Sequence, residues 1–484
     1  PALCKSVQQN AILPQNIPPT EKVKVLADHF LQAHHCTLHF REPSFDNEVN
    51  GKISQLLTNP SYLIPQPTQN PFNHALADPS QRESILPIHF VSPDSVKAAI
   101  AASKNKKSVG LDKIPSIVLK KCAPSIAPIM SSIINHCLIN AHFPTDWKSA
   151  RIVPIPKKNQ NPLNPDSYRP ISILSSSAKI FERIIKDSID EHCDSNHSIP
   201  QFQFANRPKH SVEHALLVLK SDVLLGLNRN APTIACLLDI KKAFDSVWQY
   251  GLAYKLSEVL QFHPHLCKLI LSFLDGRKSQ VQLREHLSSP YSSPAGIPQG
   301  SVLSATLFSL FTADLPKPTP HPNPIRILQY ADDLILYTST RNIPAGEARL
   351  NSYLDELYRY FTRWKLSLNP QKCETIVFHG TAKMTPKMRT KALNRATGAF
   401  KSLYPILKYT SPTPQKVKLF CYKQLIRPLL VFGFIFWSDT SPHQMERIRL
   451  KERRILRHCT NIYKNEDRSK YISNQILYDS SQTP

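Results

Sequence analysis

Apolar residues recur along this chain at two spacings, which predict alternating strands and helices. Short runs rich in β-branched, leucine and aromatic residues predict strands at 151–155, 234–240, 279–283 and 325–337. Helices are predicted at 21–33, in stretches from 93 to about 140, at 178–193, at 211–227, at 301–311 and in a tail from about 385. Helices that alternate with strands indicate a mixed α/β (α+β) fold.

The first 90 residues differ from the remainder because proline punctuates them at 14–19 and again at 60–71. Together with the single helix expected at 21–33, this pattern predicts a loosely packed lead-in or linker. The first residue is proline and not methionine, so the chain is expected to be a fragment or a processed product.

No secretory signal or membrane span is visible in the sequence. The longest apolar run near the C-terminus, 429–437, is far shorter than the roughly 20 residues that a spanning helix needs. A buried core helix is predicted there. The expected location is intracellular, in the nucleus and cytoplasm.

Two carboxylates, Asp332 and Asp333, stand side by side between the apolar halves of 325–337. Aspartate is common in turns, so a surface hairpin tip is one explanation. Such tips usually carry Gly or Asn, and neither is present. Adjacent like charges repel unless a positive charge lies beside them. A divalent cation would supply that charge.

A third carboxylate, Asp239, ends the apolar run 234–240. It would meet Asp332 and Asp333 if the strands are neighbours in one sheet. Three carboxylates would hold two Mg²⁺ ions, with Mn²⁺ as a substitute, and leave coordination positions open for phosphates. Two ions about 3.5–4 Å apart stabilise the attacking and leaving oxygens of a phosphoryl displacement. The chemistry predicted is nucleotidyl transfer.

The composition agrees with a partner rich in phosphates. Lys and Arg total 60 against 36 Asp and Glu, a net charge of +24, although a solvated basic face would give the same count. The ten cysteines are scattered without C-x-x-C spacing, which argues against a zinc site or a redox pair. Reduced thiols are expected.

Ordered blocks along the chain resemble the reverse transcriptases of jockey-like (LINE-type) non-LTR retrotransposons. The resemblance runs from about residue 90 to the end. It is carried by Leu-Asp and Ala-Phe-Asp within 238–245, Gly-Ile-Pro-Gln-Gly-Ser at 296–301 and Tyr-Ala-Asp-Asp at 330–333, with further blocks at 110–115, 152–158, 168–172, 203–211 and 364–372.

The resemblance implies a right-hand polymerase. Its expected parts are a lead-in at 1–90, fingers at 91–230, a palm with a small antiparallel sheet backed by helices at 231–382, and a basic helical thumb at 383–484. The implied activity is RNA-directed DNA polymerase. The implied partners are an RNA template, a DNA primer or target, dNTPs and an element-encoded RNA-binding protein, with no membrane.

The resemblance also implies roles for single residues. Asp239, Asp332 and Asp333 would be the catalytic metal ligands, and Lys372 would protonate the leaving pyrophosphate unless it is an ordinary loop lysine. Lys157 and Arg169 would hold the triphosphate, with Lys158 as the alternative to Lys157 and plain surface basicity as the alternative for both.

The remaining implied substrate contacts lie close to these groups. Phe244 would clash with a ribose 2′-hydroxyl, although a phenylalanine after a strand is usually core. Gln299 and Gly300 would pack against the template and the base, and Tyr330 and Ala331 would complete the site. Only 11 glycines occur in the chain, so two within five residues (296 and 300) predict a turned or closely approached backbone.

Two features of the C-terminal region bear on activity. Residues 445–457 form a basic amphipathic pattern, which is expected to grip the template–primer backbone. The family usually places a primer-supporting hairpin soon after the block at 364–372, and here the sequence passes within a few residues into lysine-rich helix. The alternative is therefore a decayed or repurposed derivative that binds nucleic acid without polymerising.

Overall fold

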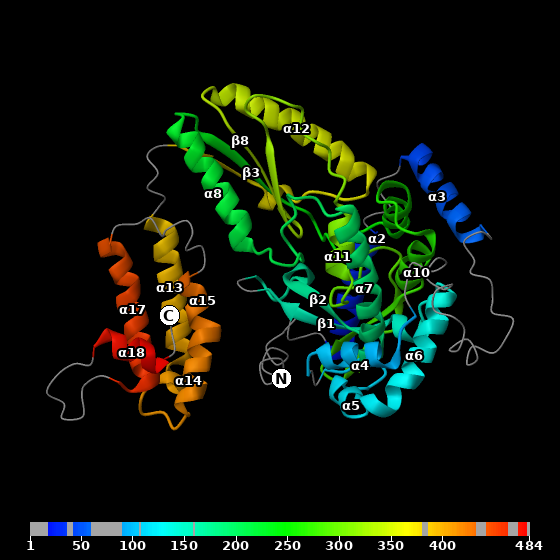
Figure 1. Cartoon of the computed structure of the whole chain (residues 1–484), viewed down its shortest axis with the longest axis horizontal. Coiled ribbons are helices and arrows are strands. Elements are labelled where there is room, and N and C mark those ends of the chain that lie inside the picture. Colours follow the sequence, from blue (N-terminus) through cyan, green and yellow to red (C-terminus); the bar gives the residue numbers. More distant parts are fainter. Residues whose placement is uncertain are drawn as a thin grey trace. The chain divides into compact units, whose positions relative to one another are not determined.

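The chain divides into two compact units, which we describe separately (Figure 1). The first comprises residues 1–209, 236–337 and 347–375, and the second comprises 210–235, 338–346 and 376–484. The computed structural model describes residues 18–35, 42–59, 90–105, 108–157, 160–379, 386–431, 442–462 and 473–481. The α/β class predicted from the sequence is confirmed.

One sheet of the first unit is built around β1 (Ser149–Pro156). It pairs antiparallel with β2 (Tyr168–Ile173) and parallel with β4 (Lys278–Leu283). Two short strands, β5 (His286–Leu287) and β6 (Tyr291–Ser292), pair with β4. The β1–β2 register places Arg169 opposite Ile155, at the end of the hairpin where Lys157 follows β1.

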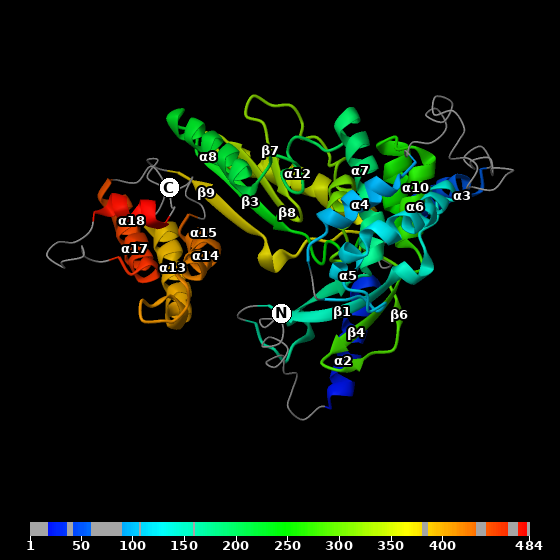
Figure 2. The ribbon, with the colours of Figure 1, turned by 60° about the horizontal axis from the view of Figure 1, so that its bottom comes forward.

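Helix α2 (Pro19–His35) is part of this first unit, which corrects the expectation of a loosely packed lead-in. It lies beside β4 (Figure 2), and its apolar face packs against β4 and the neighbouring strands. Phe30 is 4% exposed, and Ile152 and Val281 are buried in the same cluster. A second helix, α3 (Pro43–Thr58), follows within residues 1–90, where the sequence predicted only a single helix at 21–33.

The second sheet has the strand order β7 (Arg326–Tyr330), β8 (Asp333–Ser339), β3 (Thr233–Asp239) and β9 (Glu374–Phe378). Tyr330 pairs with Asp333, so the β7–β8 turn consists of Ala331 and Asp332. Because β3 neighbours β8, its C-terminal Asp239 comes to the same end of the sheet as this turn. The predicted strands at 234–240 and 325–337 are confirmed.

Helices surround the two sheets and extend several predicted segments by two or three residues. Besides α2 and α3, the α-helices described before residue 364 are α4 (Pro93–Ala102), α5 (Ser116–Lys121), α6 (Ala123–Ile139), α7 (Ser176–Asn196), α8 (Val212–Asn228), α9 (Gln249–Tyr254), α10 (Pro264–Leu274), α11 (Ser304–Phe311) and α12 (Ile343–Arg363). Among the described helices, none is both long and apolar enough to cross a membrane.

A fully buried ammonium group, Lys255, lies where α9 continues into the π-helical turn η7 (Lys255–Val259). Its Nζ donates to the Phe311 carbonyl at 2.6 Å and to Asp314 Oδ1 and the Tyr360 hydroxyl at 2.5 Å each. The Trp364 ring centroid is 3.9 Å away. Burial lowers the pKa of Lys255 to about 8, against the opposing pull of Asp314.

The C-terminal part of the second unit is helical, as expected. Its helices are α13 (Pro386–Leu407), α14 (Gln415–Cys421), η9 (Tyr422–Ile426), α15 (Arg427–Val431), α17 (Pro442–Thr460) and α18 (Asn474–Ser481). Ile448 and Ile455 of α17 are buried in a shared core with Phe400 and Tyr422, so the apolar face of the basic pattern faces protein. The core helix predicted at 429–437 lies outside the described residues beyond 431.

Candidate active site

Three carboxylates approach one another at the end of the second sheet. Asp239 ends β3, Asp332 lies in the β7–β8 turn, and Asp333 begins β8. Partial burial and the negative charges of Asp332 and Asp239 raise the pKa of Asp333, whereas the positive charge of Lys372 lowers it. Asp333 is therefore close enough to Asp332, Asp239 and Lys372 for their charges to act on it. The sequence predicted the proximity of the three aspartates only if their strands were neighbours.

Asp239 is contacted by two residues of the segment that follows α12, Asn369 and Lys372. Lys372 Nζ lies 3.0 and 3.2 Å from its two carboxylate oxygens, and Asn369 Nδ2 donates to Oδ2 at 3.2 Å. The backbone N–H of Asn369 also donates to the Asp239 carbonyl at 2.8 Å. Sequence reasoning missed Asn369, although its place beside Lys372 in the Asn-Pro-Gln-Lys block was a signal.

The carboxylates do not form a closed metal cage. Within the described ranges, no three His, Cys, Asp or Glu side chains are grouped so that they could hold a metal ion by themselves. The donor set still fits a hard divalent cation, because Mg²⁺ prefers oxygen and commonly takes one or two carboxylates with substrate phosphates and water. The mutual repulsion at Asp333 is what such a cation would relieve.

Two buried glutamines, Gln203 and Gln329, form hydrogen bonds with the backbone of the β7–β8 turn. Ala331 adopts a left-handed conformation with φ of 57°, which is uncommon without glycine. Its N–H donates to Gln203 Oε1 at 3.3 Å, and its carbonyl accepts from Gln329 Nε2 at 2.9 Å. Gln329 Nε2 also donates to Thr312. Gln203 opens the block at 203–211, which was the signal for it.

A basic group lies beside the carboxylates. The pKa of Lys157 is lowered by burial and then by Lys372, with smaller contributions from Arg169 and Lys242, so these four cations are near neighbours. Lys157 Nζ donates to the Asp166 carbonyl at 2.7 Å. Lys158, the alternative to Lys157, lies outside the described residues. Lys242 was not predicted, although it follows Asp239 by three residues.

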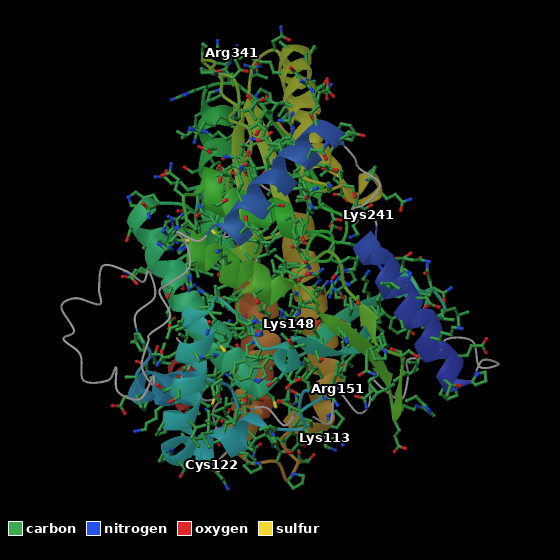
Figure 3. The ribbon with its side chains drawn as sticks, turned by 90° about the vertical axis from the view of Figure 1, so that its right-hand side faces the viewer. Lys113, Cys122, Lys148, Arg151, Lys241 and Arg341 are labelled. Atoms are coloured by element: carbon green, nitrogen blue, oxygen red, sulfur yellow. The ribbon has the colours of Figure 1, made fainter. Side chains whose placement is uncertain are left out.

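Two other basic residues of the first unit, Lys148 and Arg151, are buried or hydrogen-bonded within the protein. Figure 3 labels Lys113, Lys148, Arg151 and Lys241. Lys148 is 8% exposed, and burial lowers its pKa. Arg151 Nη2 donates to the Val109 carbonyl at 2.5 Å. These two residues are therefore not part of the exposed positive surface.

Phe244 is placed where both of its sequence interpretations remain open. Its ring is partly exposed and tilts against that of Phe308 in α11, with the centroids 5.1 Å apart. Its carbonyl accepts from the Ile297 N–H at 2.8 Å. The contact with Phe308 agrees with a core role, and the partial exposure leaves the substrate role a prediction.

The two glycines of the block at 296–301 are required by the backbone, as predicted. Gly300 has φ of 128°, and a Cβ there would lie 2.4 Å from the Ser172 carbonyl oxygen. Gly296 has φ of 88° and would meet the Asp245 carbonyl oxygen at 2.7 Å. The Gln299 carbonyl accepts from the Ser172 N–H at 2.8 Å, so this block is fastened to β2.

The helix expected at 301–311 begins three residues later, at Ser304. The reason is Glu182, a fully buried carboxylate on α7. It accepts from Ser301 Oγ at 2.8 Å and from the Val302 N–H at 2.6 Å, which holds this segment in a non-helical turn. Burial raises the pKa of Glu182. Glu182 and Ser301 are 119 residues apart in the sequence, so no local sequence pattern predicts their contact.

Replacing Gly300 by Ala is expected to destabilise the first unit by about 1–3 kcal/mol and to impair any reaction at this site. The new Cβ must displace the β2 backbone at Ser172, which is not a flexible group. Chemical denaturation measures the effect. Gly51→Ala is the matched control, because nothing lies within 4 Å of that Cβ and the position is helical; it should be neutral or stabilising. Equal stability of the two variants would contradict the prediction.

Comparison with known proteins places this site in a family. Residues 155–421, more than half of the chain, match the model of reverse transcriptases (RNA-dependent DNA polymerases). The chain belongs to the reverse transcriptase family. The matched region of this reverse transcriptase contains Asp239, Asp332, Asp333 and Lys372.

Curated relatives resemble this reverse transcriptase over most of its length. It is 29% identical to the RNA-directed DNA polymerase from mobile element jockey of Drosophila melanogaster over 77% of the chain, and 33% identical to the Drosophila funebris counterpart over 71%. The chain covers 44% and 37% of these relatives, less than half of their length. Among solved structures, apo telomerase from Candida tropicalis, truncated from its C-terminal domain, has a TM-score of 0.37 at 13% identity, covering 49% of this chain and 52% of that one.

Proposed function

We propose that this chain is the RNA-directed DNA polymerase of a jockey-like non-LTR retrotransposon and adds dNTPs to a primer 3′ end along an RNA template. The observation that carries the proposal is the approach of Asp239, Asp332 and Asp333 beside Lys372, within the region that matches the family. The proposed domain limits are fingers at 91–230, palm at 231–382 and thumb at 383–484.

The three carboxylates would hold two divalent ions, Mg²⁺ or in its place Mn²⁺. When bound, such ions stabilise negative charge on the attacking and leaving oxygens. The protein's own groups would do the remainder. Lys157, Arg169 and Lys242 would bind the triphosphate, Lys372 would deliver a proton to the leaving oxygen, and Phe244 would exclude a 2′-hydroxyl.

Replacing Lys157 by Met is expected to raise KM for dNTP by about tenfold, since one charge-assisted contact to phosphate is lost. The Lys157 ammonium lies among Lys372, Arg169 and Lys242, so the loss also weakens the local positive potential. Steady-state primer extension measures it. Lys97→Met removes an exposed helix-surface cation paired with Asp94 and is the control. Equal KM in both variants would contradict a triphosphate role.

The direct test of the function is extension of a labelled DNA primer on an RNA template with Mg²⁺ and dNTPs. Extension that stops with a chelator and returns with added Mg²⁺ or Mn²⁺ is the expected result. The same assay with ribonucleotides tests Phe244. A wild-type protein that is folded, binds template–primer and never extends it would refute the polymerase proposal.

One observation favours a second candidate, a nucleic-acid-binding derivative without polymerase activity. Strand β9 (Glu374–Phe378) is followed by α13 from Pro386, so that seven residues separate the strand from the helix. Residues 380–385 lie outside the described part. Template–primer binding without extension in the assay above is the outcome that selects this candidate.

A further inference from the structure

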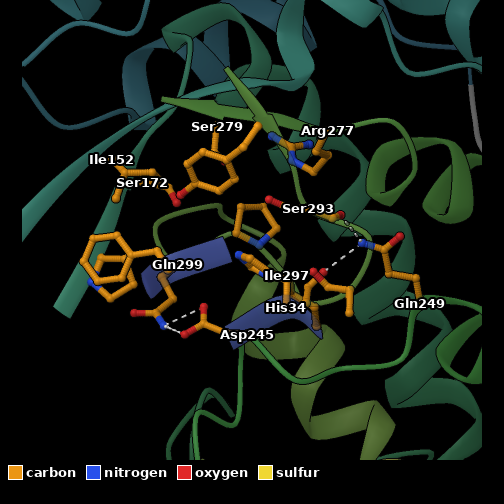
Figure 4. A pocket seen from close by; sticks show the side chains of 16 residues that line it. His34, Ile152, Ser172, Asp245, Gln249, Arg277, Ser279, Ser293, Ile297 and Gln299 are labelled. Carbon is orange, nitrogen blue, oxygen red and sulfur yellow. Dashed lines mark hydrogen bonds between the residues drawn. The ribbon is translucent and has the colours of Figure 1, made fainter. Parts of the chain in front are cut away.

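A pocket lies behind the block at 296–301, within the first unit (Figure 4). Strands β1 and β2 form one wall, and the block itself forms another. Asp245 stands in this pocket, six residues beyond Asp239, and it is 8% exposed. Nothing in the chemistry proposed above uses this buried carboxylate.

Asp245 is bound to the side chain of Gln299. The Gln299 Nε2 atom lies 3.0 and 2.9 Å from the two carboxylate oxygens (Figure 4). A carboxylate accepts hydrogen bonds only, so it can face the amide nitrogen of Gln299 but not the amide oxygen. The side chain of Gln299 is therefore fixed in one orientation, with Oε1 directed away from Asp245.

Opposing influences act on the Asp245 carboxyl, and the net effect is a raised pKa. Burial raises its pKa, and the positive charges of His34, Lys242 and Lys157, together with the Gln299 bond, act in the opposite direction. His34 comes from α2, where its Nδ1 donates to the Ala295 carbonyl at 2.8 Å. Helix α2 thus adds a histidine beside Asp245 from outside the region that matches the family.

The backbone around Gln299 is equally constrained. Its carbonyl accepts from the Ser172 N–H, and Gly296 and Gly300 flank it in conformations that exclude a side chain. Gln249 Nε2 donates to the Gly296 carbonyl at 3.1 Å. With the backbone fixed on both sides, the hydrogen bonds to Asp245 are the contacts that hold the side-chain amide of Gln299 in place.

We propose that Asp245 is a positioning residue that holds Gln299 with its amide oxygen toward the substrate, so that the site selects an incoming nucleotide or template base that offers an O–H or N–H donor. This inference rests on the proposed polymerase function. The shared chemistry is hydrogen-bond donation, which can come from the sugar hydroxyl of the nucleotide or from a base.

The test exchanges the two functional groups. Asp245→Asn lets two amides pair in either orientation, so the amide oxygen of Gln299 no longer has a fixed direction. Gln299→Glu sets two carboxylates against each other. The double variant Asp245→Asn/Gln299→Glu restores a unique arrangement of the same net charge, in which the amide introduced at position 245 donates and an oxygen at position 299 again faces the substrate.

The readout is the Kd of dNTP for the protein on a template–primer whose primer ends in a dideoxynucleotide, so that binding is measured without catalysis. Each single variant is expected to raise Kd by about tenfold or more, and the double variant is expected to recover most of the loss. Ser293→Ala, which lines the same pocket apart from this pair, is the control and should leave Kd unchanged. Thermal unfolding of all variants separates binding from stability.

Comparison of dNTP with 2′,3′-dideoxynucleotide distinguishes the two donors. If the sugar hydroxyl is the donor, the wild type prefers dNTP and Asp245→Asn loses that preference. If a base is the donor, the preference is the same in both proteins while Kd rises for both ligands. Additive single effects without rescue in the double variant would overturn the inference. A wild type that binds dNTP but never extends a primer would instead refute the polymerase function.

Discussion

Replacing Asp332 by Asn is expected to lower the rate of primer extension at saturating dNTP by about 10³-fold. Asparagine has the same shape, so the two-residue turn between Tyr330 and Asp333 should be retained. The loss is one negative charge at the point where three carboxylates approach one another. Because the Asp332 charge raises the pKa of Asp333, removing it should also relieve repulsion there.

The relief of repulsion makes the outcome distinctive, because folding stability should stay equal or rise while activity is lost. Single-turnover extension on an RNA template measures the rate, and thermal unfolding measures the stability. Asp355→Asn, a carboxylate on α12, is the matched control and should extend normally. Extension by Asp332→Asn within about tenfold of the wild type would remove Asp332 from the proposed metal site.

Replacing Lys255 by Ala is expected to destabilise the first unit by about 3–5 kcal/mol at pH 7. The substitution leaves the Asp314 carboxylate and the Tyr360 hydroxyl without their cation and opens space among the Phe311 and Trp364 rings. Lys255→Met keeps most of the volume and should cost less. Denaturant unfolding followed by tryptophan fluorescence measures both, since Trp364 touches the ammonium group.

The same residue predicts how stability varies with pH. The folded pKa of Lys255, about 8, is below the usual 10.5, so the unfolded chain binds this proton more tightly. The contribution of Lys255 to stability therefore rises as pH increases above about 8. The pKa of Tyr360 is raised well above 10.0, so the unfolded chain releases that proton first and stability falls again above about pH 10.

Both lysine variants should lack the rise between about pH 8 and 10. Lys52→Met removes a cation of ordinary exposed type, paired with Glu258 at 3.2 Å, and should change stability by no more than about 1 kcal/mol without altering the pH profile. A wild type whose pH profile matches that of Lys255→Met would show that Lys255 is not desolvated as described.

Sequence patterns were sufficient to predict features that depend on residues close together in the chain, such as strands and glycine turns. The strands predicted at 234–240 and 325–337 were enough to predict that the three aspartates lie close together. The glycines at 296 and 300 predicted a constrained backbone, and the structure shows that the constraint comes from the backbone of Asp245 and Ser172. The roles assigned to Lys157, Arg169, Phe244 and Lys372 stay predictions. Their positions agree with those roles without testing them.

Contacts between distant segments were not predictable in the same way. Glu182 binds the turn at 301–302 across 119 residues, Gln203 supports Ala331 across 128, and Asp245 holds Gln299 across 54. A buried carboxylate or amide has no periodicity of its own in a sequence. Strand β2 was missed as well, because Pro170 lowers the strand propensity of a segment that pairs at the edge of its sheet.

The packing of α2 bears on how this catalytic unit could be moved between proteins. The boundaries of sequence similarity, 155–421, would omit α2 and also cut β1 near its end. A transplanted module with those limits would expose Val281, Leu283 and Tyr168 to water. Such a fragment should aggregate, whereas one that begins before Pro19 retains the cover. The segment that must be kept for folding, which includes α2, is therefore longer than the segment 155–421 defined by sequence similarity.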